Sequence, residues 1–191
     1  FVAFDATTLE LVQDLTVASE VRGEEFGPMA LTLDRAAGKL YSVGLSTGEV
    51  VVLDGATGAV DKMFRFPSVN GGIGVAIDPE GRRLYVAAQG SDNLVIANAD
   101  TGEVLHDVYV GAGAVYVAFD PHSKLAYVAS RGAGTITAVD ANGNIVANLD
   151  GGTFPNHVLP TGDGTVYAVN KSRGAEDQDG DQIRRIAPKA E

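Results

Sequence analysis

A short apolar segment built around a tyrosine recurs four times in the chain, and it restricts the possible folds more than any other feature. Successive tyrosines are separated by 44, 42 and 40 residues. A nearly constant period of roughly 20–50 residues is typical of arrays in which one supersecondary unit is repeated. The four segments are Leu40–Val43, Leu84–Ala87, Ala126–Ala129 and Val166–Val169.

Two sets of polar residues recur in the same register. The first set lies seven residues before each tyrosine and is an aspartate in three copies, with Pro160 in the fourth place. The second set follows each tyrosine and leads into turns such as Asp100–Gly102. Three periodic features in one register indicate that the repeat is structural. The first set is Asp34, Asp78 and Asp120, and the second is Asp54, Asn98 and Asp140, with Asp5 one repeat earlier.

Each repeat contains four short runs of strand-forming residues. In residues 72–110 they are separated by the turn Asp78–Gly81, a loop at 89–93 and the turn Asp100–Gly102. Strands at this spacing indicate an all-β protein, and no segment shows a sustained helical period. A four-stranded antiparallel unit of this length is typical of a β-propeller blade, which buries both faces only by stacking on neighbours. We therefore expect the tyrosines to pack in the core between blades.

The repeat predicts about four and a half blades in a single domain, residues 1–191. Residues 28–66, 72–110 and 113–150 are expected to form complete blades, while residues 1–18 and 156–188 supply partial ones. In residues 1–18 we expect a third strand at Val2–Asp5 and a fourth at Leu9–Val17. The ragged ends favour a fragment of a larger ring, whose remaining N-terminal portion is absent or associates with this chain as a separate piece.

Charge and composition exclude several classes of protein. Acidic residues outnumber basic residues 25 to 14, which gives a formal net charge of −11. Nucleic-acid backbones are bound through a basic face, so this balance argues against a nucleic-acid partner. The chain has no cysteine, which excludes disulfides, thiol catalysis and cysteine-ligated metals. No apolar run approaches the ~20 residues of a membrane helix, so we expect no membrane insertion.

The tyrosine segments and turns of the Asp78–Gly81 and Asp54–Gly58 types resemble those of the YVTN-repeat β-propellers. The closest likeness is to the YncE-like periplasmic proteins, and it covers essentially all 191 residues. The most specific match lies in the tail, where Phe154–His157 precedes a strand and a long polar insertion follows at 171–181.

The resemblance implies a seven-bladed, WD40-like ring of which this chain forms the C-terminal four-and-a-half blades. It also implies a bacterial exported protein that is periplasmic or secreted. Pro160 in place of the turn aspartate, and Arg35–Gly38 without a proline, depart from the pattern at single turns. The family supplies no catalytic motif that can be transferred to this chain.

Loops at one end of a propeller commonly form its ligand surface. Here these are the loops that enter each blade and those between the second and third strands. His157 beside Asn156 is the foremost candidate for ligand contact, and a structural, hydrogen-bonded histidine is the alternative. The predicted ligand-binding residues are His157, Asn156, Arg131, Asn70 and Lys171, and further polar residues of these loops are Glu24, Glu25, Asn93 and Arg173.

The polar insertion carries carboxylates at every second position. Asp177, Asp179 and Asp181 alternate as calcium ligands do, because oxygen donors suit a hard cation. Residue 182 is glutamine where a calcium loop would favour glycine, and a solvated hairpin tip is the alternative. Calcium is the one cofactor that the sequence suggests.

Three functions remain open at this stage. No nucleophile elbow, zinc-protease motif or phosphate-binding loop occurs in the sequence, which favours a non-catalytic propeller of the bacterial cell envelope that binds a small molecule or protein. The first alternative is a lactonase-like, metal-dependent hydrolase that uses Glu24, Glu25 and Asn70 in the propeller channel. The second is single-stranded nucleic-acid binding through Arg131, Lys171 and Arg173.

Overall fold

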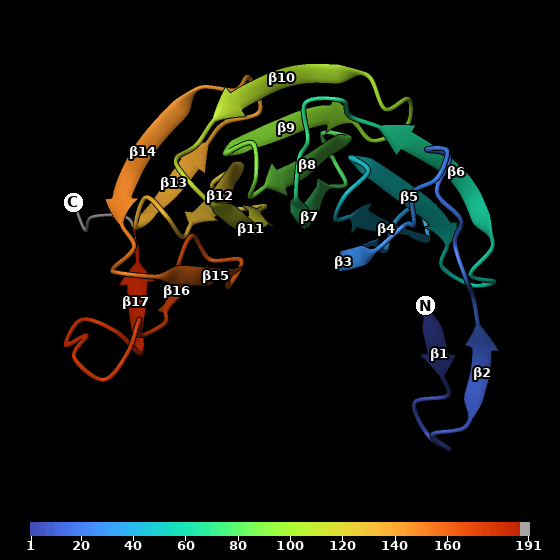
Figure 1. Cartoon of the computed structure of the whole chain (residues 1–191), viewed down its shortest axis with the longest axis horizontal. Coiled ribbons are helices and arrows are strands. Elements are labelled where there is room, and N and C mark those ends of the chain that lie inside the picture. The colour runs from blue at the N-terminus through green and yellow to red at the C-terminus, as the bar shows by residue number, and fades with distance from the viewer. Residues whose placement is uncertain (188–191) are drawn as a thin grey trace.

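A computed structural model describes residues 1–187 as an all-β protein whose sheets follow one another along an open arc (Figure 1). The described residues form 17 strands in five antiparallel sheets, and neighbouring strands in each sheet are also neighbours in sequence. Within residues 1–187 nothing helical has the length and apolar character needed to cross a membrane. The expected all-β propeller of four-stranded blades is confirmed.

Three sheets have four strands each, and we call them the first, second and third blades. In each of them the earliest strand lies nearest the inside of the arc and the last lies at the outer rim (Figure 1). The first blade contains β3 (Pro28–Asp34), β4 (Lys39–Gly44), β5 (Glu49–Asp54) and β6 (Val60–Arg65). The second contains β7 (Gly72–Asp78), β8 (Arg83–Ala88), β9 (Asn93–Asn98) and β10 (Val104–Tyr109). The third contains β11 (Ala114–Asp120), β12 (Leu125–Ser130), β13 (Thr135–Val139) and β14 (Ile145–Asp150).

Two smaller sheets stand at the ends of the arc. The N-terminal hairpin pairs β1 (Val2–Phe4) with β2 (Leu11–Asp14), and the last sheet contains β15 (Pro155–Pro160), β16 (Val166–Asn170) and β17 (Gln182–Ile186). The strand expected at Leu9–Val17 is therefore shorter than predicted. Its start is delayed because Leu9 belongs to the turn at Asp5, where it has a φ of 61° and donates its N–H to the Asp5 carbonyl at 2.9 Å.

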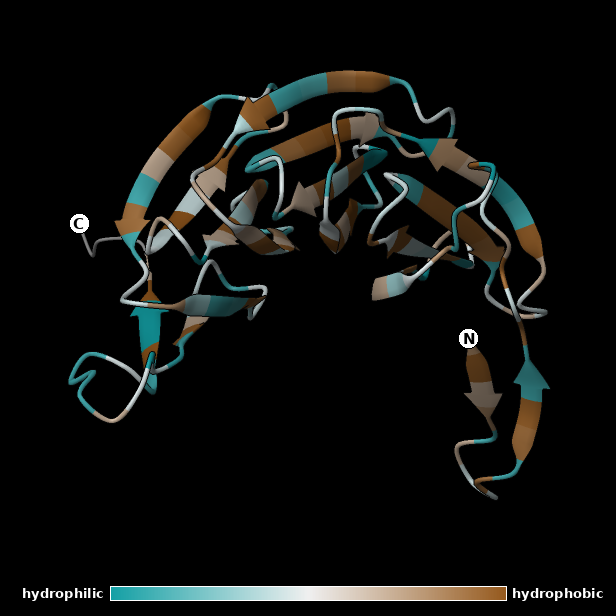
Figure 2. Ribbon diagram, viewed as in Figure 1, coloured by the Kyte–Doolittle hydropathy of each residue, from teal (hydrophilic) through white to brown (hydrophobic). Residues whose placement is uncertain are grey.

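The hydrophobic core consists of separate layers between neighbouring sheets. The middle strands of the complete blades are largely hydrophobic, whereas the turns at their ends are hydrophilic (Figure 2). Tyr41, Tyr85 and Tyr127 are buried in these layers, as the repeat predicts. Tyr167 is the exception with 38% of its surface exposed, because β16 belongs to the last sheet and no described sheet stacks on its far side.

The periodic aspartates close the turns between the first two strands of each blade. The carboxylate of Asp78 accepts the backbone N–H groups of Glu80 at 3.1 Å and Gly81 at 3.0 Å. Asp34 and Asp120 accept equivalent bonds in their own turns. Aspartate side chains commonly cap turns in this way, so these residues are structural.

The last sheet shifts this pattern by one residue. Asp120 is the partner of Leu125, two residues before the repeat tyrosine, whereas Pro160 is the partner of Val166, one residue before it. Thr161, not Pro160, therefore occupies the place of the turn aspartate, and its N–H binds the carbonyl of Thr165 at 2.9 Å. The turn has three residues between these partners instead of the four in the other copies, so it is one residue shorter. The carboxylate of Asp163 caps it by accepting the Thr165 N–H at 2.9 Å.

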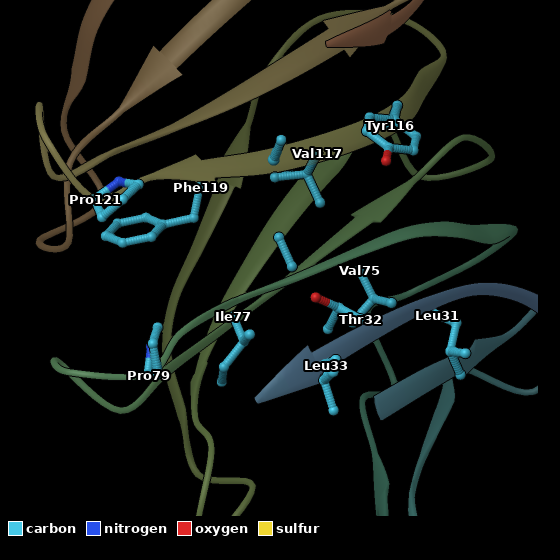
Figure 3. A pocket seen from close by; sticks show the side chains of 12 residues that line it. Leu31, Thr32, Leu33, Val75, Ile77, Pro79, Tyr116, Val117, Phe119 and Pro121 are labelled. Atoms are coloured by element: carbon cyan, nitrogen blue, oxygen red, sulfur yellow. The ribbon is translucent and has the colours of Figure 1, made fainter. Parts of the chain in front are cut away.

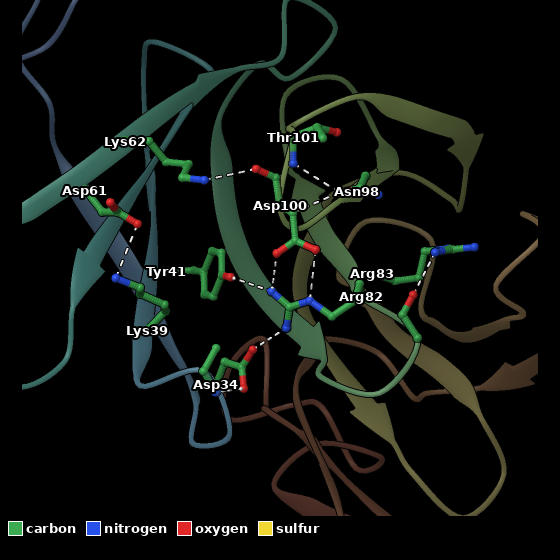
Figure 4. Close-up of polar contacts among 12 residues, drawn as sticks. Asp34, Lys39, Tyr41, Asp61, Lys62, Arg82, Arg83, Asn98, Asp100 and Thr101 are labelled. Atoms are coloured by element: carbon green, nitrogen blue, oxygen red, sulfur yellow. Dashed lines mark hydrogen bonds and ion pairs between the residues drawn. The ribbon is translucent and has the colours of Figure 1, made fainter.

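Arg82 joins the first and second blades at the end of the strands where these turns lie (Figure 4). Its guanidinium binds both carboxylate oxygens of Asp100 in its own blade, at 2.7 and 3.2 Å. It also pairs with Asp34 of the first blade and lies 3.5 Å from the Tyr41 hydroxyl. The Asp34 side chain is fully buried, so Arg82 supplies the charge that such a carboxylate requires.

Removal of Arg82 leaves the buried Asp34 carboxylate without its counter-charge. We expect Arg82→Ala to lower the free energy of unfolding by roughly 2–4 kcal/mol, slightly less than for a fully buried pair because Arg82 keeps some contact with water. Urea unfolding followed by circular dichroism measures this loss.

Lys124 provides a matched control for this experiment. It occupies the corresponding turn of the third blade and pairs with Glu80 of the second, but both side chains are largely exposed. Exposed ion pairs contribute little to stability, so we expect Lys124→Ala to unfold almost as the wild type does. If both variants lost the same free energy of unfolding, the burial of Asp34 would not be the cause of the loss in Arg82→Ala.

The same pair predicts how stability depends on pH. Burial by itself raises the pKa of Asp34, but the Ala37 N–H and the Arg82 guanidinium lower it, and the pKa lies below its ordinary value. The stabilisation is therefore present above the unfolded-state pKa of about 3.9 and is lost as the pH falls through the folded-state pKa. We expect the stability difference between wild type and Asp34→Asn to shrink between pH 6 and pH 3, measured by urea titrations. A constant difference would contradict this prediction.

Candidate functional site

Three loops of the third blade and the last sheet meet around the ring of Phe154, and we call this group of side chains the Phe154 cluster. Arg131 comes from the loop between β12 and β13, Phe154 from the loop before β15, and Arg173 from the loop after β16. The guanidinium carbons of Arg131 and Arg173 lie 4.7 and 5.2 Å from the centroid of the Phe154 ring. Both distances suit cation–π contacts, which hold the two cations close to each other.

Arg131 is fixed by both its backbone and its side chain. Its N–H donates to the carbonyl of Gly113 at 2.8 Å, and its own carbonyl accepts from the guanidinium of Arg173 at 3.3 Å. Its Nη2 donates to the side-chain oxygen of Asn156. Its Nε is buried and has no hydrogen-bond partner within residues 1–187. The predicted residues Arg131 and Asn156 therefore belong to one site, and one donor of that site is unsatisfied.

His157 lies next to this site and stacks on Tyr116 of the neighbouring inner strand, β11. The two ring centroids are 3.8 Å apart and the ring planes are inclined by 37°. Burial lowers the pKa of His157 and raises the pKa of Tyr116, so both rings are neutral at pH 7. Among the described residues the imidazole makes no side-chain hydrogen bond. The pair thus offers two tilted aromatic rings rather than an acid or a base.

Buried Asn170 and the polar insertion support the loop that carries Phe154. The side-chain oxygen of Asn170 accepts the Phe154 N–H at 2.7 Å, and the Phe154 carbonyl accepts the N–H of Lys171 at 3.0 Å. The carboxylate of Asp177 accepts the Thr153 hydroxyl at 2.5 Å and the backbone N–H of Arg173 at 2.9 Å. Lys171, predicted from the sequence as a ligand-binding residue, is exposed.

The alternating carboxylates do not converge on a point. The Asp177 carboxylate binds the loop's own backbone, including the Asp179 N–H at 3.2 Å, and the Asp181 carboxylate binds the Ser172 N–H at 3.0 Å. No group of three or more acidic or histidine side chains in residues 1–187 is arranged to hold a metal ion. The insertion therefore uses its carboxylates to shape the loop in the structure as described.

The remaining predicted residue, Asn70, lies in a different sector. Its backbone N–H binds the hydroxyl of Ser91 at 3.0 Å, and its carbonyl accepts the N–H of Gly90 at 2.9 Å. These bonds join the loops before β7 and after β8, and no hydrogen bond in residues 1–187 connects Asn70 to the Phe154 cluster. Asn93 is buried and donates to Asp107 at 2.6 Å, so it has a structural role in the second blade.

The basic side chains of the Phe154 cluster form no direct ion pairs within residues 1–187, although the polar insertion itself carries Glu176, Asp177, Asp179 and Asp181. Arg131, Lys171 and Arg173 take part in no salt bridge within the described chain, although acidic residues outnumber basic ones overall. Residues that do form ion pairs lie elsewhere, and they are Lys39, Arg82, Lys124 and Arg184. The cluster thus contains guanidinium groups that form no salt bridge with the described residues.

An apolar groove faces the inside of the arc. The groove, of ≈ 330 Å³, opens among the inner strands β3, β7 and β11, and apolar side chains such as Leu33, Ile77 and Phe119 line it (Figure 3). Its lining contains no carboxylate or imidazole, so the groove offers no ligands to a metal ion. Glu24 and Glu25, which the hydrolase alternative requires, do not line it.

Sequence reasoning missed the two aromatic residues that organise the site. Phe154 was recognisable only as part of a family-like segment, and Tyr116 only as the end of a loop that enters a blade. The sequence does place an aromatic residue and basic residues in loops of adjacent blades. Their contact can be predicted only once the stacking of those blades is known.

Comparisons with known proteins identify the fold. No family model matches the chain, and no curated protein matches it. A chain of hydrazine synthase from Kuenenia stuttgartiensis superposes with a TM-score of 0.76 and 20% identity, covering 92% of this chain and 49% of that chain. A chain of the mitotic checkpoint complex gives a TM-score of 0.74 and 16% identity, covering 90% and 51%.

The WD40 domain of Neurospora crassa Pan2 is also similar, with a TM-score of 0.61, 13% identity and coverage of 82% of this chain and 46% of that chain. This chain therefore spans about half the length of each of these proteins. Identities this low show a shared fold and nothing finer. Together with the four-stranded sheets, they show that the chain has a WD40-like β-propeller fold.

Proposed function

We propose that the chain is part of a non-catalytic binding propeller of the bacterial cell envelope, of the YVTN-repeat, YncE-like type, and that the Phe154 cluster is its binding surface. The Phe154 cluster carries the proposal, because it places two guanidinium groups, which form no salt bridge with the described residues, on one aromatic ring in the loops that join the strands of adjacent blades. The periplasmic or secreted location rests on the sequence resemblance alone.

The alternatives draw less support from the described residues. A metal-dependent hydrolase needs converging carboxylates or imidazoles, and residues 1–187 contain no such group. Single-stranded nucleic acid needs a basic groove that follows the backbone. Here three basic residues gather in one sector of a chain whose net charge is −11.

A ligand panel tests the proposed surface. We expect one class among peptides, sugars, nucleotides and carboxylic acids to raise the melting temperature of the wild-type protein. At about 100 times its dissociation constant, a ligand stabilises its protein by about 2.7 kcal/mol, which is several degrees of melting temperature. In Arg131→Ala the ligand-induced shift should disappear. Thermal unfolding with and without each ligand measures both effects.

Lys124→Ala is the control, because Lys124 is a basic residue at the opposite end of the blades. We expect it to retain the full ligand-induced shift. The proposal is wrong if every class leaves the wild type unchanged, or if Arg131→Ala responds as the wild type does. Robust turnover of ester, lactone or phosphoester substrates by the wild type would also contradict it.

A further inference from the structure

We infer that Arg131 and Arg173 bind an oxyanion, the carboxylate or phosphate group of a small ligand. The inference rests on the proposed function and specifies the ligand class of the same site. It starts from two guanidinium groups that share one aromatic ring.

The electrostatic argument concerns two guanidinium groups that lie close together and form no salt bridge within the described residues. The chain has 25 acidic and 14 basic residues, so an acidic partner would be easy to supply. In the polar insertion the carboxylate of Asp177 instead binds the Thr153 hydroxyl and the backbone N–H of Arg173. Like charges held near each other repel, and a bound anion removes that repulsion.

The hydrogen-bonding argument concerns the donors of Arg131. A guanidinium has five N–H donors arranged as a planar fork, and it accepts no hydrogen bonds. One donor of Arg131 binds Asn156, and the buried Nε has no partner within the described residues. Phe154 covers the guanidinium through its ring, which contributes no acceptor in the plane of the fork. The buried Nε is out of a ligand's reach, but an acceptor that approaches in this plane would satisfy the Nη donors for which the described residues supply no partner.

These two properties select the ligand class. Arginine forks match the paired oxygens of carboxylates and phosphates, and charge-assisted bonds of this kind are stronger than neutral ones. A cation is repelled by the site, and a neutral hydroxyl leaves its charge uncompensated. Carboxylates and phosphates share the chemistry that the site recognises, so the experiment must distinguish them.

Isothermal titration at low ionic strength tests the inference with two probes, succinate and inorganic phosphate. We expect at least one probe to bind the wild type, and Arg131→Gln and Arg173→Gln each to weaken that binding by about tenfold or more, the loss of one charge-assisted hydrogen bond. Lys124→Gln removes the same charge at the opposite end and should change affinity by less than about twofold. The probe that binds identifies the group as a carboxylate or a phosphate.

Each other outcome overturns the inference. It fails if neither probe binds the wild type, or if Lys124→Gln weakens binding as much as the other variants, which would indicate a general effect of charge. If Arg131→Gln does not fold, exposed Arg173→Gln decides the result alone. If both probes fail but a neutral ligand binds through Arg131, the assignment of an oxyanion is wrong, while the proposed binding surface stands.

Discussion

The stacking of sheets that are apolar on both faces is the constraint on which the rest of the structure depends. In the second blade, alternate residues of β8 and β9 are buried in two different layers: Leu84 and Val86 face the first blade, while Tyr85 and Ala87 face the third. A blade on its own would leave both of these faces in water, at a cost of about 25 cal/mol for each Å² of apolar surface. The hydrophobic effect therefore requires neighbours on both sides, which produces an arc of radially arranged blades.

This arrangement confines polar groups to the two ends of the blades, where they have different tasks. At the turn end, carboxylates cap their own turns, and Arg82 couples one blade to the next through buried Asp34. At the loop end, polar side chains hold loops against strands: buried Glu49 accepts the Ser19 hydroxyl at 2.7 Å, and Asn170 accepts the Phe154 N–H at 2.7 Å. The loops are thus positioned by the blades rather than free.

The repeat was sufficient to predict blades and turns because both depend on residues close in sequence. The alternation of apolar residues around Tyr85 determines a strand, and Asp78 determines the turn before it by capping nearby N–H groups. The same reasoning misplaced the last turn, since this turn is one residue shorter and its structural position moves from Pro160 to Thr161. Periodicity alone contains no information about such a deletion.

The candidate site was only partly predictable because its contacts cross between sheets. Arg131 and Asn156 were identified from their loops, but the role of Phe154 and the stacking of Tyr116 on His157 depend on the distance between the third blade and the last sheet. That distance is set by the apolar layer that includes Tyr127 and Val158. The site and the core are therefore coupled. A ligand that bridges Arg131 and Arg173 binds only the stacked arrangement, so it must also stabilise the junction between these two sheets.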